Sequence, residues 1–198
     1  ARTSRHGLRG VRLSLAHPEF FGAQLRALLR AARHGQLRVL FPFVSSLEQV
    51  RAARTALRLA EAALVARGET VGRVAVGVMI EVPSAALTAD LIAREVDFLT
   101  IGTNDLIQYA MAVDRADERV SDLYQPLHPS LLRMLRLVRR AAARARIPVS
   151  LCGEMAADPG LLALLVGLGL REFSMAAGAL AVARQVLSAL DERELRAL

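Results

Sequence analysis

Side chains suited to metal, phosphate and proton chemistry follow three apolar segments of the sequence. Glu81 stands at the end of the apolar run 74–82, Asn104 and Asp105 follow the run 96–101, and Cys152 follows 148–151. A carboxylate binds hard cations, an amide can reach a phosphate oxygen, and a thiol can deliver a proton. The simpler alternative for Asn104 and Asp105 is helix capping, because both residue types are preferred N-caps.

Predicted helices and strands alternate along the chain. The strands are predicted at 37–43, 74–82, 96–101, 148–151 and 172–175. A helix is predicted at 18–32, and a long second helix follows the Ser45–Glu48 segment and ends at about Arg67. Further helices are predicted at 83–94, 106–113 and 130–146, after Pro159, and at 179–190. Ser45 and Glu48 fit a capping box for the second helix, and Asp158 fits an N-cap before Pro159. Strict alternation of this kind predicts a parallel α/β fold.

The distribution of the polar residues separates two parallel α/β folds. A (β/α)8 barrel builds its site at the carboxyl ends of several strands, whereas a doubly wound sheet gathers ligands at one switch point. Glu81, Asp105 and Cys152 follow three different predicted strands, which favours the barrel. The sequence also lacks GxGxxG and GxxxxGK[ST], the signatures of nucleotide-binding loops. We expect one domain over residues 1–198.

Composition narrows the function classes. The net charge is +7, all 26 basic residues are Arg, and aromatic residues make up 4%. The arginines are dispersed and few aromatics are present for base stacking, so we expect no nucleic-acid partner. Six arginines have mostly helical spacing and predict the wet face of an amphipathic helix: Arg133, Arg136, Arg139, Arg140, Arg144 and Arg146. No apolar run has membrane-spanning length, and the single cysteine allows no internal disulfide; we expect a cytoplasmic protein without a membrane partner.

Six ordered motifs give the chain a family resemblance. They are Gly77–Pro83, Gly102–Leu106, Ala112–Arg115, Leu123–Pro126, Cys152–Met155 and Glu172–Met175. In this order they resemble Enzyme I, the phosphoenolpyruvate–protein phosphotransferase of the bacterial sugar phosphotransferase system. The resemblance runs from about Gly7 to Leu190. Pyruvate phosphate dikinase and phosphoenolpyruvate synthase share the Cys-Gly motif, but the Gln-Tyr and Leu-Tyr-Gln-Pro segments look more like Enzyme I.

The resemblance implies a (β/α)8 barrel that binds phosphoenolpyruvate and Mg²⁺. By matching motifs, the metal ligands are Glu81 and Asp105, and Cys152 is the acid that protonates the enolate carbon. The residues that bind the substrate's phosphate and carboxylate are Arg9, Asn104, Asp105 and Arg115. Arginine forks suit these anions because they bind them through paired hydrogen bonds.

The chain also departs from the family pattern. We count about five of the eight strands that a complete barrel has. The N-terminal domain that carries the phosphorylated histidine, and through which the family reaches its phosphocarrier protein, is expected to be absent. The resemblance further implies a homodimer, because the barrel of Enzyme I carries the dimer interface.

Two other functions remain open at this stage. One is a Mg²⁺-dependent lyase acting on a pyruvate enolate, which uses a similar Glu–Asp metal pair on the same barrel. The other is a non-catalytic dimerisation or regulatory fragment. For Cys152 alone, the plainest interpretation is a packed core residue.

Overall fold

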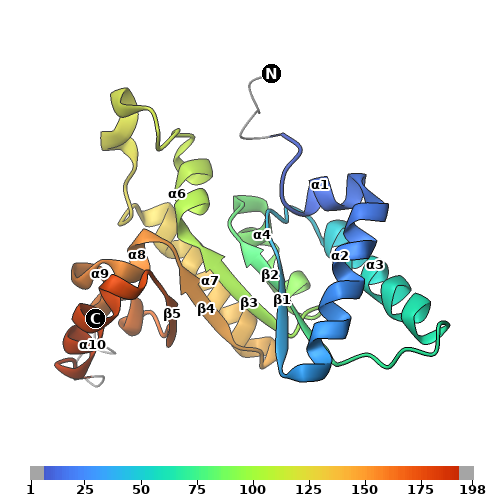
Figure 1. Cartoon of the computed structure of the whole chain (residues 1–198). Helices are drawn as coiled ribbons and strands as arrows, with labels where there is room; N and C mark the ends of the chain where they lie inside the picture. The colour runs from blue at the N-terminus through green and yellow to red at the C-terminus, as the bar shows by residue number, and fades with distance from the viewer. Residues whose placement is uncertain (1–6, 192–198) are drawn as a thin grey trace.

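Five parallel strands form the centre of the computed structural model, which describes residues 7–191 (Figure 1). The strands are β1 (Leu37–Phe41), β2 (Val74–Ile80), β3 (Phe98–Gly102), β4 (Val149–Cys152) and β5 (Glu172–Ser174). They pair in sequence order, β1-β2-β3-β4-β5, and every pairing is parallel. A doubly wound sheet reverses its strand order at the switch point, so this sequential order belongs to the barrel type.

Helices precede, connect and follow the strands. They are α1 (Val11–Ala16), α2 (Pro18–Ala31), α3 (Leu47–Val65), α4 (Pro83–Leu87), α5 (Ala89–Ile92), α6 (Thr103–Met111), α7 (Pro129–Ala145), α8 (Glu154–Ala157), α9 (Pro159–Gly167) and α10 (Leu180–Ser188). Three short 3-10 helices, η1 (Ala32–His34), η2 (Glu118–Leu123) and η3 (Ala177–Ala179), complete the set among the described residues. η2 lies in the segment that projects beyond α6 in Figure 1.

The sheet is an incomplete (β/α)8 barrel, as the sequence predicted. A closed barrel of this type has eight strands. Among residues 7–191 there are five, and β1 and β5 each pair along one edge only. The carboxyl ends of the strands point toward the start of α6 in Figure 1, the end at which barrels of this type place their sites.

Aliphatic side chains hold the layers together. Val78, Ile80, Leu99 and Ile101 are fully buried on β2 and β3, as expected for strands covered on both faces. On α7 the residues Leu131, Leu135 and Val138 are buried, whereas the six arginines at 133–146 are exposed. The predicted wet face of this helix is therefore confirmed. In the described part of the chain, no helix is long and apolar enough to cross a membrane.

Several helix ends differ from the sequence prediction. The predicted Ser45–Glu48 capping box is wrong: Ser46 occupies the N-cap of α3, and the Ser45 hydroxyl and N–H contact Gln49 Oε1. The single helix predicted over 83–94 is two helices, α4 and α5. Between them, Thr88 Oγ1 donates to the carbonyl of Ser84 at 2.8 Å, a contact that bends helices.

The predicted cap of the helix after Pro159 is confirmed. Asp158 Oδ1 accepts a hydrogen bond of 2.8 Å from the N–H of Gly160 at the start of α9. Two short helices, α1 and α8, were not predicted from the sequence. Each is too short to show a clear helical period of apolar residues.

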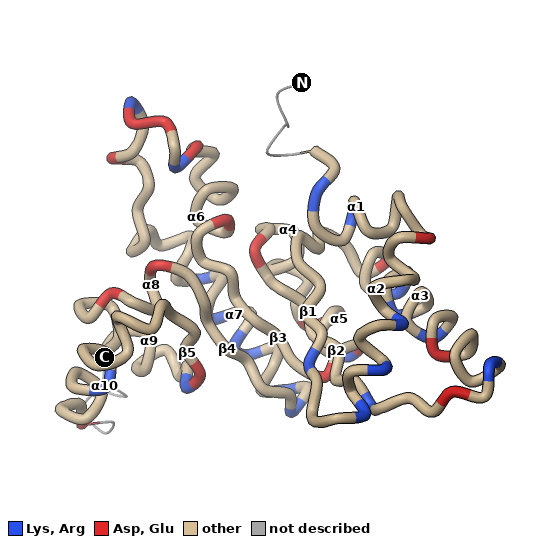
Figure 2. Tube along the Cα trace, in the orientation of Figure 1, with Lys and Arg blue, Asp and Glu red and all other residues tan. Residues whose placement is uncertain are grey.

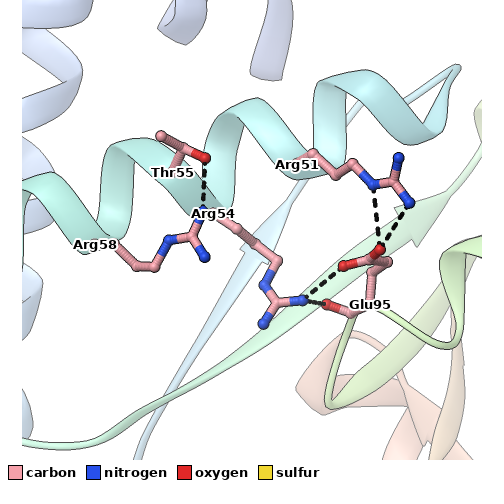
Figure 3. A network of polar contacts seen from close by, with 5 residues as sticks. All are labelled: Arg51, Arg54, Thr55, Arg58 and Glu95. Atoms are coloured by element: carbon pink, nitrogen blue, oxygen red, sulfur yellow. Dashed lines mark hydrogen bonds and ion pairs between the residues drawn. The ribbon is translucent and has the colours of Figure 1, made fainter.

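An arginine network ties α3 to the segment that follows α5 (Figure 3). Arg51 Nη2 and Arg54 Nη1 each lie 3.0 Å from a different carboxylate oxygen of Glu95. Arg54 also donates to the main-chain carbonyl of Glu95, and Arg58 donates to Thr55 Oγ1 at 2.9 Å. Glu95 lies between β2 and β3 in the chain, at the end away from the carboxyl ends of these strands. The network therefore holds α3 against the segment that follows α5, and its charged groups lie away from the carboxyl ends of the strands.

Candidate active site

Strand register brings the predicted site residues to one level of the sheet. Ile80 pairs with Ile101, so Glu81 follows β2 beside Gly102. Gly102 in turn pairs with Cys152 at the end of β4. Figure 2 shows acidic residues near the starts of α4, α6 and α8, where these strands end. The carboxyl ends of β2, β3 and β4 thus place their polar residues side by side.

A cavity of about 240 Å³ opens at this edge of the sheet. It is lined by all six residues selected from the sequence, Arg9, Glu81, Asn104, Asp105, Arg115 and Cys152, together with Met79, Gly102, Thr103 and Gly153. These residues come from five separate segments of the chain, including the one before α1. The structure therefore places every sequence-predicted site residue in one cavity.

Asn104 and Asp105 do not cap α6. The helix begins at Thr103 after Gly102, and no side chain caps its N-terminus. Asp105 Oδ2 instead accepts a hydrogen bond of 2.9 Å from Arg9 Nη2, and Asn104 Oδ1 accepts one of 2.9 Å from the N–H of Glu154. The capping alternative is therefore wrong, because both side chains turn toward other segments of the site.

Gly153 makes the close approach of β4 to α6 possible. Its φ is +107°, and a Cβ at this position would lie 2.4 Å from Thr103 Oγ1 and 2.7 Å from Asn104 Oδ1. Thr103 Oγ1 also donates to the carbonyl of Cys152 at 2.9 Å. Only glycine fits here without moving the segment that carries Cys152 away from Asn104.

Two guanidinium groups flank the cavity. Arg9 is 43% exposed at its side chain and pairs with Asp105, while Arg115 is 44% exposed and has its Nη1 3.8 Å from Glu154 Oε1. Both lie at the rim of the cavity. Their positive charge suits an anionic ligand, and their partial exposure leaves donors to bind it.

Burial changes the proton affinity of Glu81. Glu81 is 7% exposed, and desolvation is the largest cause of its raised pKa. The negative charge of Asp105 raises this pKa further, while the 2.6 Å hydrogen bond from the N–H of Phe43 and the charge of Arg9 lower it. The two carboxylates therefore repel each other in a largely desolvated setting, which a shared cation would relieve.

The pair of carboxylates fits a Mg²⁺ ion. In the described residues there is no group of three or more His, Cys, Asp and Glu that could hold a metal, so this chain offers two carboxylates here. Mg²⁺ is commonly bound by one or two carboxylates and completes its coordination with water and phosphate oxygens. The cavity between the two carboxylates and the two arginines has room for such additional ligands.

The setting of Cys152 favours a protonated thiol. Cys152 is half-buried and lines the cavity, so it is not wholly enclosed in the core. Desolvation raises the pKa of its thiol above the ordinary 9.0, and the charge of Glu81 raises it further. A thiol that keeps its proton at neutral pH is suited to act as an acid, not as a nucleophile.

The raised pKa of Glu81 predicts a pH-dependent effect on stability in metal-free buffer. A carboxyl with a higher pKa in the folded state favours folding below its ordinary pKa of 4.5, and this contribution is lost as pH rises through the folded-state pKa. Glu81→Gln has no such titration. We expect the unfolding free energy of Glu81→Gln, relative to wild type, to rise with pH above 4.5 in urea titrations. A difference independent of pH would contradict the desolvated setting of Glu81.

Sequence reasoning missed two aromatic residues of the site. Phe43 donates its N–H to Glu81, and Tyr109 Oη accepts a 3.3 Å hydrogen bond from Arg9 Nη1. Phe43 ends a predicted apolar strand, which indicates core packing, and Tyr109 belongs to the Gln-Tyr segment, which marked the family resemblance but no role in the site. Tyr124 also contacts the site through a 3.5 Å hydrogen bond to the carbonyl of Asn104; desolvation, chiefly, raises its pKa to about 12.

Sequence comparison places this chain beside phosphoenolpyruvate-dependent proteins. The profile of the family described as "PEP-utilising enzyme, PEP-binding domain" matches residues 5–192. The phosphoenolpyruvate-protein phosphotransferases of Listeria monocytogenes and Bacillus subtilis are each 47% identical, over 96% and 95% of this chain, and that of Lactococcus lactis is 48% identical over 97%. The matches cover 33%, 33% and 34% of those proteins, so the chain spans about a third of their length.

Solved structures support the fold assignment. A citrate lyase from Burkholderia xenovorans aligns with a TM-score of 0.63 and 16% identity, over 91% of this chain and 58% of that one. A malate synthase from Haloferax volcanii aligns with a TM-score of 0.61 and 16% identity, over 89% and 54%. At this identity the likeness concerns the fold alone.

Proposed function

This chain belongs to the PEP-binding domain family of PEP-utilising enzymes, and on that premise we propose that its cavity binds phosphoenolpyruvate with Mg²⁺ for phosphoryl transfer to a protein histidine. The recipient pathway in this proposal is the sugar phosphotransferase system. The observation that carries it is the meeting of two carboxylates, two arginines, an amide and a thiol in one cavity. The arginines and the amide suit the anionic groups of phosphoenolpyruvate, the carboxylates suit its Mg²⁺ ion, and the thiol suits the carbon that must be protonated.

Glu81 and Asp105 are the residues that would hold the metal ion. A bound Mg²⁺ would supply positive charge beside the oxygen on which the enolate forms. The main-chain N–H of Phe43 holds Glu81 in place for this task, and Arg9 does the same for Asp105. The two carboxylates are therefore oriented before any ligand arrives, which lowers the cost of binding.

Arg9, Arg115 and Asn104 would bind the anionic groups of the substrate. Phosphoenolpyruvate carries a phosphate and a carboxylate, and planar guanidinium groups bind each of these through paired hydrogen bonds. Arg9 and Arg115 are partly exposed and line the same cavity from different segments of the chain, before α1 and after α6. Asn104 adds an amide to the lining. Two guanidinium groups suit a ligand with two anionic groups better than one with a single anionic group.

Cys152 would act after the phosphoryl group has left. Breaking the bond between phosphorus and the enol oxygen transfers the phosphoryl group to the histidine nitrogen and leaves the enolate of pyruvate. The Cys152 thiol then gives its proton to the enolate carbon, which completes pyruvate, and the thiolate regains a proton from solvent. The raised pKa of this thiol keeps it in the form that can donate.

The histidine that accepts the phosphoryl group would come from another domain. None of the histidines in residues 7–191 lines the cavity, and His128 instead caps α7 by accepting from the N–H of Ser130. The proposal therefore includes a separate phosphohistidine domain and a downstream phosphocarrier protein. It also includes a homodimer, as the resemblance to Enzyme I implies, and a cytoplasmic location.

The lyase hypothesis has weaker support. The citrate lyase and the malate synthase share the fold with this chain at 16% identity, whereas the phosphotransferases share 47% of aligned residues. Calorimetric titration of phosphoenolpyruvate into the chain, with Mg²⁺ and then with EDTA, tests the proposal. Mg²⁺-dependent binding supports it; no binding in either buffer contradicts it and leaves the non-catalytic alternative.

Arg115→Lys should weaken the binding of phosphoenolpyruvate in the same titration. Lysine keeps the positive charge but loses the planar fork, so we expect the dissociation constant to rise about tenfold. Arg119→Lys is the matched control, because Arg119 lies shortly after Arg115, in η2, and pairs with Asp117 outside the cavity. Equal affinities for wild type and Arg115→Lys would rule out a bidentate contact at position 115.

A further inference from the structure

Phe43 has an unusual backbone conformation at the rim of the cavity. It follows β1 with φ of +61°, a left-handed conformation that is rare for a bulky residue. Phe43 is 3% exposed. This conformation turns the N–H of Phe43 toward Glu81 Oε1, 2.6 Å away. A strained residue that contacts a site residue directly indicates a functional constraint.

The ring of Phe43 supports the arginine that faces the cavity. The guanidinium carbon of Arg9 lies 4.6 Å from the ring centroid, within the range of a cation–π interaction. Arg12 lies 4.7 Å from the same centroid, and the ring of Tyr109 meets it edge-on at 5.8 Å. Tyr109 also accepts a hydrogen bond from Arg9. Arg9 is thus held by the ring of Phe43 and by hydrogen bonds to Tyr109 and Asp105.

The segment that carries Arg9 is built to lie on Phe43. Gly10 has φ of +54°, and a Cβ there would lie 2.5 Å from the Cβ of Phe43 and 2.9 Å from the carbonyl of Pro42. The N–H of Val11 donates to that carbonyl at 3.0 Å. Glycine at position 10 is therefore required for the backbone beside Arg9 to approach Phe43 this closely.

We propose that Phe43 is a positioning residue that fixes two groups of the site at once: its ring holds the Arg9 guanidinium, and its main-chain N–H holds the Glu81 carboxylate. The inference rests on the proposed function for the roles of Arg9 in binding phosphoenolpyruvate and of Glu81 in binding Mg²⁺. It adds a single residue that couples the position of the anion-binding group to that of the metal ligand.

The two contacts of Phe43 can be separated by mutation. Phe43→Leu removes the ring but keeps the N–H that holds Glu81. We expect the dissociation constant for phosphoenolpyruvate at saturating Mg²⁺ to rise about tenfold, since a partly desolvated cation–π contact is lost. The affinity for Mn²⁺, used as the metal probe without substrate, should change by less than about twofold. A merely structural role would lower both affinities together.

Phe98→Leu is the matched control. Phe98 is also buried, and Arg38 lies over its ring at 4.6 Å, but this pair is at the amino ends of β1 and β3, outside the cavity. Both variants lose one buried ring; Phe43→Leu loses its cation–π contacts with Arg9 and Arg12, and Phe98→Leu loses one with Arg38. Loss of phosphoenolpyruvate affinity in Phe43→Leu but not in Phe98→Leu supports the proposal; equal losses in both overturn it.

A second measurement needs no ligand. The Nε–H signal of Arg9 in ¹⁵N relaxation spectra, assigned with Arg9→Lys, reports how rigidly its guanidinium is held. We expect the order parameter of the Arg9 Nε–H group to fall in Phe43→Leu and to stay unchanged in Phe98→Leu. Retained order in Phe43→Leu overturns the role of the ring, whatever the affinities are. If wild type binds no phosphoenolpyruvate but Arg9 loses order in the variant, the proposed function fails and the positioning role stands.

Gly10→Ala tests the same contact from the segment that carries Arg9. The added methyl group would collide with the Cβ of Phe43 and the carbonyl of Pro42, so this segment and the ring must move apart while the Phe43 side chain is kept. The proposal expects the same selective losses of Arg9 order and phosphoenolpyruvate affinity, even where Phe43→Leu does not fold. Wild-type values for both in Gly10→Ala would overturn it.

Discussion

Mg²⁺-dependent binding of phosphoenolpyruvate is expected to fall about a hundredfold or more in Asp105→Asn. Asp105 is 9% exposed and is one of the two carboxylates that line the cavity. Removing one partner of a buried charged set costs about 3–5 kcal/mol, because the remaining charge loses its compensation. Asparagine keeps an oxygen that accepts the hydrogen bond from Arg9, so the arginine stays near its position. The loss should therefore concern the metal ion.

A comparison with and without Mg²⁺ isolates that effect. In EDTA the affinity of Asp105→Asn for phosphoenolpyruvate should equal or exceed that of wild type, because a negative charge near an anionic ligand has been removed. The control is Asp97→Asn, which also loses one carboxylate. Asp97 accepts a hydrogen bond from the N–H of Val76 at the opposite end of the sheet, away from the cavity. Mg²⁺-dependent binding that survives in Asp105→Asn would remove Asp105 from the metal site.

The fold was predictable because it follows from the order of strands and helices along the chain and from the positions of the polar residues between them. Alternating apolar strands and helices required a parallel sheet, and site residues after three different strands favoured a barrel. Element ends were less predictable. The hydroxyl of Thr88 bends the chain between α4 and α5, and Ser46, not Ser45, occupies the cap of α3. Both depend on side-chain hydrogen bonds that a pattern of apolar residues does not record.

The site was predictable to the extent that motifs marked it. Glu81, Asp105 and Cys152 stand at strand ends, where the register of a parallel sheet brings them together. Phe43 carries no such mark, since its role depends on a left-handed backbone and on the approach of Arg9 from a distant segment. The two carboxylates proposed to bind a metal are thus recognisable from sequence, but Phe43, which donates its N–H to Glu81, is recognisable only in three dimensions.

Turnover should fall about a hundredfold or more in Cys152→Ala, measured in a protein that holds this barrel together with its phosphohistidine domain. A positioned acid typically accelerates proton transfer by a factor of about 10²–10⁴, and alanine has no proton to give. Binding should be nearly unchanged, because Cys152 makes no ion pair or side-chain hydrogen bond to Glu81 or Asp105 in the described structure. The loss should therefore appear in kcat and not in the dissociation constants for Mg²⁺ and phosphoenolpyruvate.

The pH dependence of that turnover adds a second test of the thiol. Because desolvation and Glu81 raise the pKa of Cys152, the wild-type rate of pyruvate formation should not lose this acid until pH passes its ordinary value of 9.0. Cys152→Ser is the control for shape: its hydroxyl is a far weaker acid, so the rate should stay low although the cavity is preserved. If Cys152→Ala instead turns over like wild type, Cys152 is a packing residue at the edge of the core, and the proton for the enolate carbon comes from another group that lines the cavity.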